Sequence, residues 1–283
     1  MTEERTLHEA LKWASSFLEA RGVEVAGAKW LLEDVVGKSG VSFQLALHER
    51  LTEKQWQLFQ QMIQRFASGE PAQYITGEAH FYGRTLLVNP AVLIPRPETE
   101  ELVELILERG EERFQHPKIV DIATGSGAIA LTLAKEWPEA EVSASDLSGD
   151  ALQVAMANAE RLGVNVRLRE GDLTEPFQGE KFHIIISNPP YIPEKDIEEL
   201  QTNVRAHEPH MALVGGTDGL DFYRRLSVEI QDIIRADGIA FFEIGYDQGS
   251  AVAAIMKKAF PRAKVSVHAD LNGNDRIVVV DLQ

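Results

Sequence analysis

From residue 118 to residue 282, apolar segments with strand character alternate with amphipathic helical segments. Strands joined through helices in this way pair in parallel, with the helices covering both faces of the sheet. The pattern therefore predicts an α/β domain with a doubly wound, mainly parallel sheet. The predicted strands are 118–122, 141–145, 166–170, 183–187, 239–244, 263–268 and 276–282, and the predicted helices are 128–135, 151–162, 222–235 and 250–260.

The first 70 residues lack this alternation and have the pattern of short amphipathic helices. Thr6 with Glu9, and Thr52 with Gln55, have the spacing of a capping box at a helix start. Apolar residues at helical spacing follow each box, which predicts a small bundle whose helices bury one another. The expected division of the chain is an all-helical domain at 1–70, a connector with a β-hairpin at 71–97 and the α/β domain at 98–283.

Composition excludes several classes of function. The net charge is -16, and residues 1–86 contribute -2 of it while residues 87–283 contribute -14. The acidic region has no cluster of Lys and Arg, so we expect no direct nucleic-acid partner. The sequence contains no cysteine, which excludes disulfides, thiolate metal sites and cysteine nucleophiles, and we expect no metal.

The sequence has no apolar run near the roughly 20 residues that a membrane-spanning helix needs. Its N-terminus lacks a cationic start followed by an apolar stretch, and reads instead as an amphipathic helix. We therefore expect a cytoplasmic protein without a membrane partner.

A glycine-containing loop lies between the predicted strand 118–122 and the helix that follows. Such a loop lets the backbone approach a ligand closely, and nicotinamide, flavin and S-adenosylmethionine sites all use one. A plain tight turn is the alternative. The candidate cofactor residues here are Asp121, Ala123, Thr124, Gly125, Ser126 and Gly127.

Acidic residues end the next two strands. Asp146 is placed where a carboxylate accepts hydrogen bonds from both ribose hydroxyls of an adenosine-containing cofactor, although it can also start a helix, a role for which Ser148 competes. Asp172 can accept from an adenine amino group and Leu173 can pack on the adenine face. A solvated loop aspartate is the alternative for Asp172.

The tetrapeptide Asn188-Pro189-Pro190-Tyr191 directly follows the apolar segment 183–187. Its two prolines rigidify the loop and remove two backbone donors, so nearby carbonyls can face a substrate without competition. The Asn188 side-chain carbonyl and the Pro189 backbone carbonyl can together accept both hydrogens of a substrate NH2 group. Tyr191 can form a wall of the site and lie against a cationic centre. The structural alternative is a polar-capped turn that contains a core tyrosine.

These motifs together resemble class I S-adenosylmethionine-dependent methyltransferases that methylate a planar nitrogen. Further motifs are similar to those of the HemK/PrmC family, the glutamine-N5 methyltransferases of peptide chain release factors. They are Tyr74-Ile75-x-Gly77, Phe81-Tyr82-Gly83, Leu93-Ile94-Pro95-Arg96-Pro97-Glu98-Thr99-Glu100, Glu208-Pro209 and Gly273-x-Asp275-Arg276. One position departs from the family, whose loop often has Gly where this chain has Ala123. An alanine there is harmless only if its φ is negative.

The resemblance implies a class I methyltransferase fold, S-adenosylmethionine as cofactor, and a release factor that presents the glutamine of its Gly-Gly-Gln tip. The candidate catalytic residues are Asn188, Pro189 and Tyr191; Pro190 joins them in substrate binding, and Asn188 is also a cofactor contact. A ribosomal-protein glutamine methyltransferase would share the same tetrapeptide, and an adenine-N6 methyltransferase is disfavoured by the acidic charge. A nicotinamide-dependent oxidoreductase would leave the tetrapeptide unexplained, and a non-catalytic adaptor would not need it. Arg96 and Glu98 are left open between a pocket wall and an inter-domain strut.

Overall fold

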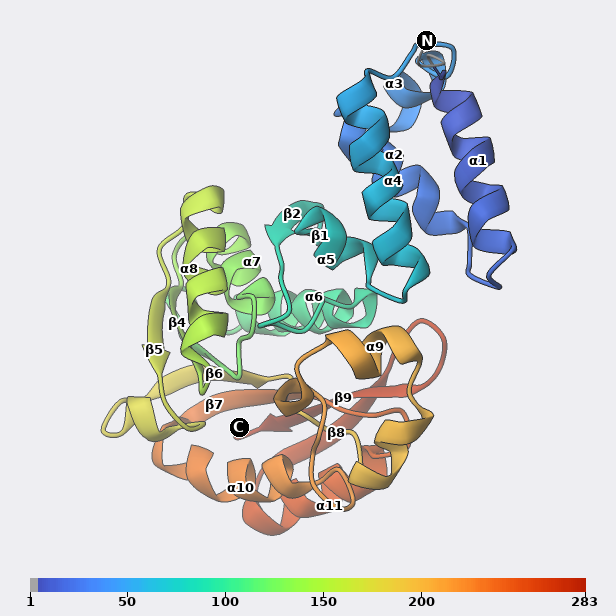
Figure 1. The fold of residues 1–283 in the computed structure, drawn as a ribbon. Helices are drawn as coiled ribbons and strands as arrows, with labels where there is room; N and C mark the ends of the chain where they lie inside the picture. The colour runs from blue at the N-terminus through green and yellow to red at the C-terminus, as the bar shows by residue number, and fades with distance from the viewer. Residues whose placement is uncertain (1–4) are drawn as a thin grey trace. The chain divides into compact units, whose positions relative to one another are not determined.

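The computed structural model describes residues 5–283, which divide into two compact units (Figure 1). One unit contains the chain up to Glu78 together with the segment Gln201–His207, and we call it the helical unit. The other contains Ala79–Leu200 and Glu208–Gln283, and we call it the sheet unit. Each is described separately below.

The helical unit is built from short amphipathic helices, as predicted. Both capping boxes form: the Thr6 hydroxyl accepts from the Glu9 N–H at 3.3 Å, and the Thr52 hydroxyl accepts from the Gln55 N–H at 3.3 Å. The apolar faces meet in one core around Phe43 and other fully buried side chains. The helices are α1 (Leu7–Glu19), α2 (Ala26–Val36), α3 (Gly40–Leu45), α4 (Glu53–Ala67), α5 (Ala72–Thr76) and α9 (Thr202–His207).

The sheet unit is organised by a seven-stranded sheet in the order β5-β4-β3-β6-β7-β9-β8. The pairings from β5 to β7 are parallel, and β9 is antiparallel to both β7 and β8. The prediction of a mainly parallel sheet is thus confirmed. The strands are β3 (Lys118–Ile122), β4 (Glu141–Asp146), β5 (Arg167–Glu170), β6 (Phe182–Ser187), β7 (Ile234–Glu243), β8 (Lys264–Ala269) and β9 (Asp275–Asp281), and a separate hairpin pairs β1 (Glu78–Phe81) with β2 (Arg84–Leu87).

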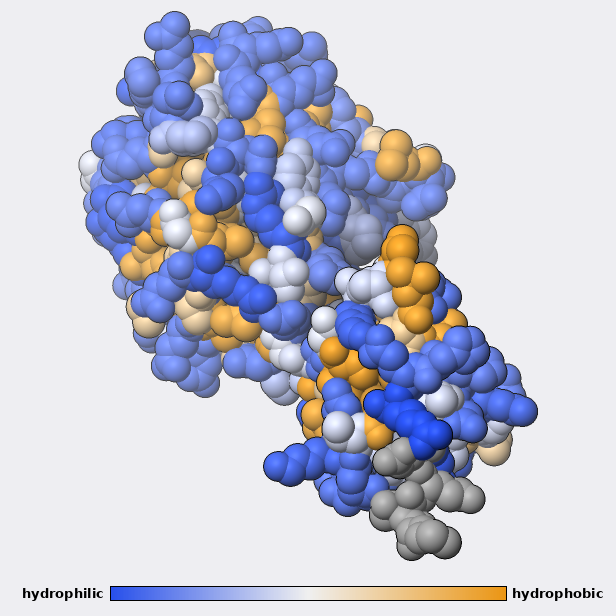
Figure 2. Space-filling view, turned by 90° about the horizontal axis from the view of Figure 1, so that it is seen from above, coloured by the Kyte–Doolittle hydropathy of each residue, from blue (hydrophilic) through white to orange (hydrophobic). Residues whose placement is uncertain are grey.

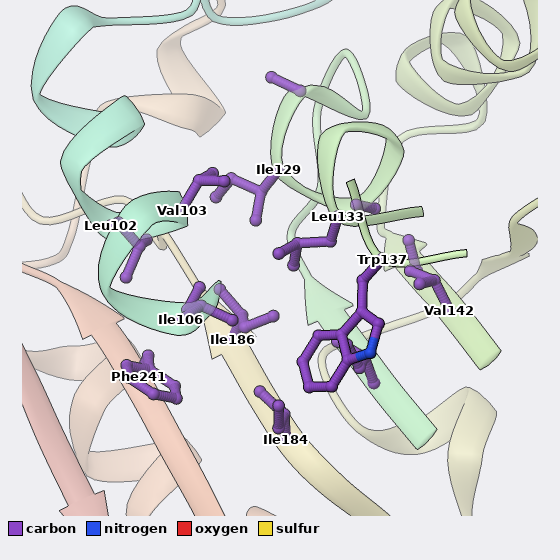
Figure 3. Packing of buried hydrophobic residues seen from close by; sticks show 14 of the residues in the cluster. Leu102, Val103, Ile106, Ile129, Leu133, Trp137, Val142, Ile184, Ile186 and Phe241 are labelled. Atoms are coloured by element: carbon purple, nitrogen blue, oxygen red, sulfur yellow. The ribbon is translucent and has the colours of Figure 1, made fainter. Parts of the chain in front are cut away.

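Helices cover both faces of this sheet (Figure 1). One face carries α6 (Pro97–Glu111), α7 (Ala128–Glu136) and α8 (Gly149–Leu162), and the other carries α10 (Asp221–Glu229) and α11 (Gly249–Ala259). Figure 3 shows side chains of α6 and α7, such as Ile106 and Leu133, pointing toward the strand residues Ile184 and Ile186. A second core fills the α10–α11 face around the buried Tyr223. The central strands β3, β6 and β9 are therefore mostly buried, whereas the edge strands β5 and β8 are half-buried or exposed. The described residues also include short 3₁₀ helices at Glu175–Phe177, Glu194–Glu199, His210–Ala212 and Ile230–Asp232.

The predicted helix 222–235 is wrong at its C-terminal end. The apolar spacing of Ile230, Ile233 and Ile234 favours a helix that continues to residue 235, but α10 ends at Glu229. Ile234 instead begins β7 and pairs with Phe182, and the register shifts before the next pair. The sheet edge next to β6 offers backbone partners that an isolated helix end lacks, so tertiary pairing decides the segment.

Among residues 5–283, no helix is both long and apolar enough to cross a bilayer. Hydrophilic residues cover most of the face shown in Figure 2, and apolar residues lie between them. Most large apolar side chains are instead buried in the three cores.

Candidate active site

A pocket opens in the sheet unit where the carboxyl ends of β3, β4, β5 and β6 meet. In the strand order, β3 lies between β4 and β6, so the chain leaves β3 at the switch point where open α/β sheets bind ligands. The strand-end residues that line the pocket are Ala123, Thr124, Gly125, Ser126, Asp146, Leu147, Ser148, Gly171, Asp172, Leu173, Asn188 and Pro190. The opposite wall includes Ala91, Val92, Leu93, Pro95, Arg96, Thr99, Pro209, Met211, Ala212 and Phe222.

The loop after β3 is held in a left-handed conformation. Gly125 has φ 57° and Gly127, which caps α7, has φ 81°. Ala123 also has a positive φ, 63°, so the condition for a harmless alanine is not met. An L-residue in this region costs about 1–2 kcal/mol. Ala123 therefore introduces strain at the position where glycine is unstrained.

Asp121 and Gly127 lie outside the pocket lining and support the loop from below. Asp121 is fully buried, and its Oδ2 accepts a hydrogen bond from the Thr124 hydroxyl at 2.6 Å. Its other oxygen has no hydrogen-bond partner among the described residues. Burial raises the pKa of Asp121 to about 7. The Thr124 hydroxyl and the Ala130 backbone N–H oppose this shift in pKa, so the carboxyl fixes the loop to the start of α7.

Asp146 holds the same loop from the next strand. Its Oδ2 accepts from the Gly125 N–H at 2.8 Å and its Oδ1 accepts from the Ser148 N–H at 2.9 Å. Burial raises the pKa of Asp146, while these backbone hydrogen bonds oppose the shift. Ser148 is the residue that caps α8, through Ala151. Asp146 is thus not needed as a cap, and a carboxylate has lone pairs left for ribose hydroxyls.

Asp172 and Leu173 both line the pocket at the end of β5. Leu173 is buried, with φ 47°, and offers an apolar surface. Asp172 accepts from Arg225 at 2.8 Å, an ion pair that the sequence did not indicate. A hydrogen bond from adenine to Asp172 would therefore form beside a guanidinium group.

Some residues of the tetrapeptide after β6 line the pocket, and the others hold the loop in place. Asn188 is half-buried and lines the pocket with Pro190, which is buried, whereas the buried Pro189 between them is not among the lining residues. The Tyr191 side chain packs against the core on the α10–α11 face, and burial raises its pKa to about 12. The Tyr191 carbonyl accepts from the Gln248 amide at 2.9 Å, which anchors the loop.

Sequence reasoning missed two buried polar residues behind Asn188. Asn188 Nδ2 lies 3.4 Å from the hydroxyl of Thr99, which donates to Glu243 Oε2 at 2.7 Å. Burial raises the pKa of Glu243 to about 7. The available sequence signal was a carboxylate inside the apolar run Phe241 to Ile244.

The open question about Arg96 and Glu98 is partly resolved within the sheet unit. Arg96 lines the pocket and donates to the buried Glu208 at 2.6 Å, and Glu208 also accepts from the Ile94 N–H at 3.4 Å. The segment before α6 is thereby fixed against the wall of the pocket. Glu98 does not belong to the lining.

Comparisons with known proteins identify the family of this chain. The family description "PrmC N-terminal domain" matches residues 9–77, and "Methyltransferase small domain" matches residues 98–209. The release factor glutamine methyltransferase of Bacillus subtilis is 47% identical over 279 residues, 97% of each chain, and that of Bacillus cereus is 44% identical over 281 residues, 98% of this chain and 99% of the relative. This chain belongs to the release factor glutamine methyltransferase family. The resemblance seen in the sequence is thus confirmed.

Solved structures agree on the fold of this family member. A methyltransferase from Pyrococcus furiosus superposes with a TM-score of 0.54 at 19% identity, covering 71% of this chain and 90% of that one. At this identity the likeness concerns the fold alone, and the predicted class I methyltransferase fold is confirmed. The predicted cofactor, S-adenosylmethionine, is confirmed by the methyltransferase domain.

Proposed function

We propose that this chain transfers a methyl group from S-adenosylmethionine to the side-chain amide nitrogen (N5) of the glutamine in the Gly-Gly-Gln motif of class 1 peptide chain release factors. The observation that carries the proposal is the position of Asn188, a side-chain amide at the end of β6 that lines the same pocket as the glycine loop. Family membership and relatives of nearly equal length support the substrate.

The residues of the pocket fit the cofactor. S-Adenosylmethionine supplies an electrophilic methyl group on a positively charged sulfur. Asp146 would accept from the ribose hydroxyls, and Leu173 would pack against the adenine ring. Asp121 would shape the loop that holds the remainder of the cofactor, because its carboxylate accepts from the Thr124 hydroxyl. A buried carboxylate is also suited to a positively charged ligand.

The target nitrogen is a poor nucleophile because its lone pair is delocalised into the amide carbonyl. Positioning must therefore supply much of the rate acceleration. The Asn188 side-chain oxygen and the Pro189 backbone oxygen would accept the two N–H groups and orient the nitrogen toward the methyl group, while favouring charge that develops on nitrogen. The proton can leave to water, so the proposal assigns no general base. Pro190 would form part of the wall, and Tyr191 would hold the loop from behind.

The N-terminal helices would recognise the substrate protein. We assign this role to the predicted domain 1–70, with 71–97 as a connector and 98–283 as the catalytic domain. Every residue that lines the pocket belongs to the sheet unit. Methyl transfer in the pocket therefore needs no residue of the helical unit. A protein substrate, in place of nucleic acid, is also compatible with the charge of -16. Release factors act in the cytoplasm, which is where we expect the enzyme to act.

The decisive experiment incubates the full chain with methyl-labelled S-adenosylmethionine and unmethylated release factor, followed by mass spectrometry of the tryptic peptides. One added methyl on the Gly-Gly-Gln glutamine supports the proposal. A ribosomal protein mixture and an adenine-containing oligonucleotide serve as competing substrates. Faster labelling of either one would show that the release factor is not the preferred substrate.

A further inference from the structure

Two buried polar side chains next to Asn188 have no part in the chemistry described above, although one of them, Thr99, lines the pocket. Thr99 lies in the first turn of α6, after Pro97 at the helix start, and Glu243 ends β7. They are 4% and 1% exposed, respectively. Thr99 accepts a hydrogen bond from the Asn188 amide at 3.4 Å, and the same amide helps to hold down the pKa of the Glu243 carboxyl.

The direction of these hydrogen bonds follows from the carboxylate. An ionised carboxylate can only accept, so the Thr99 hydroxyl donates to Glu243 at 2.7 Å and its lone pairs face Asn188. The NH2 group of Asn188 therefore finds two acceptors on this side, Thr99 and Glu243. An amide has its oxygen on the other branch, so this arrangement directs the Asn188 oxygen away from Thr99 and Glu243, on a side chain that lines the pocket.

We propose that Glu243 and Thr99 are positioning residues that fix the orientation of the Asn188 amide, so that its oxygen and not its NH2 group meets the substrate nitrogen. This inference rests on the proposed function for the role of Asn188. If the Asn188 amide were rotated by half a turn, its NH2 group would face the substrate NH2 group, and both groups are donors. Such a pair repels and cannot orient the nitrogen.

The surroundings of Glu243 do not provide another reason for a buried carboxylate. Arg276 favours its ionised form electrostatically, but the Arg276 side chain pairs with Asp270 at 3.2 Å. Glu98 opposes ionisation. The two tyrosines that sense its charge are Tyr191 and Tyr223, and the Tyr223 hydroxyl donates to the Glu243 backbone carbonyl, not to the carboxylate. A buried carboxylate without a directly bonded cation destabilises the folded protein. Its presence at this position is therefore explained by a role in orienting the Asn188 amide.

The test compares four variants of the full-length enzyme. Glu243→Gln keeps the size but adds a donor that can bond the Asn188 oxygen, and Thr99→Val removes the hydroxyl without changing the shape. Both should lower kcat on release factor by about 10- to 100-fold, with the calorimetric Kd for S-adenosylmethionine within about twofold of wild type. Thr99→Ser keeps the hydroxyl and should retain most of kcat. Thr132→Val is the matched control, because the Thr132 hydroxyl in α7 is equally buried and has no partner among the described residues.

A spectroscopic measurement separates this inference from the proposed function. In asparagine-labelled enzyme without ligand, the side-chain NH2 resonance of Asn188, identified by its loss in Asn188→Asp, should shift in Glu243→Gln and Thr99→Val and stay unchanged in Thr132→Val. Unchanged resonances, or full kcat in Glu243→Gln, would overturn the positioning role. Shifted resonances in an enzyme that does not methylate release factor would instead refute the proposed function and leave the amide orientation supported.

Discussion

Replacing Ala123 by glycine should stabilise the sheet unit. The Ala123 backbone has φ 63°, where an L-residue costs about 1–2 kcal/mol and glycine costs little. Glycine gives back part of this gain, about 0.4–1 kcal/mol, because it increases the conformational entropy of the unfolded chain. The net expectation for Ala123→Gly is a free energy of unfolding that is higher by about 0.5–1 kcal/mol.

The assay must report on the sheet unit, because two compact units need not unfold together. Hydrogen exchange of β3 and α7 peptides, measured by mass spectrometry across a urea series, follows the elements on either side of the loop. Calorimetry with S-adenosylmethionine should give an unchanged Kd, because glycine adopts the positive φ of Ala123 without strain and the loop therefore keeps its conformation.

The control is the same substitution in a helix. Ala130 is fully buried in α7, and Ala130→Gly should destabilise the unit by about 1 kcal/mol or more. Ala123→Gly and Ala130→Gly should thus have opposite signs. If both destabilise to the same extent, the positive φ of Ala123 does not describe the folded loop and the strain argument is refuted.

Four further experiments probe the site and the division of the chain. Asn188→Ala should lower kcat by at least about 100-fold with little change in cofactor Kd, since an orienting acceptor is lost; near-wild-type turnover would remove its proposed role. Asp146→Ala should weaken S-adenosylmethionine by roughly 2 kcal/mol in calorimetry, because the ribose loses a charged acceptor. With Glu243 at a pKa of about 7, kcat at saturating cofactor should decline as pH falls below about 7, because protonation removes an acceptor of the Asn188 amide, and Glu243→Gln should lack this acid limb. A chain beginning at Ala72 should bind cofactor but methylate intact release factor poorly. A Gly-Gly-Gln peptide should be a poor substrate for the full-length and the shortened chain, and both should methylate it at similar rates.

The parallel strands could be predicted because short segments of strand character alternate with amphipathic helical segments. The predicted bounds of 118–122 are those of β3, which is paired on both sides. The segment after Glu229 could not be assigned in the same way, because its apolar spacing fits a helix as well as a strand. Pairing of Ile234 with Phe182, which is distant in sequence, decides it.

The same distinction applies to the site. Asn188 and the glycine loop could be found because their chemistry is concentrated in short segments next to strand ends. Thr99 and Glu243 are separated by 144 residues and meet only when α6 packs on the sheet. Nothing in either segment alone indicates that one residue hydrogen bonds to the other. The sequence likewise showed that an alanine at position 123 is strained if its φ is positive, but only the structure gives the sign of that φ.

The assignment of Gln201–His207 to the helical unit means that the chain crosses between the two units three times. During synthesis, the first 78 residues emerge well before this last piece, so the ribosome must extend the chain past residue 207 before the helical unit is complete. Domains usually fold in the order of synthesis. Here the helical unit, which emerges first, needs the segment Gln201–His207, which is synthesised within the sequence of the sheet unit. Completion of the helical unit therefore depends on synthesis of most of the sheet unit.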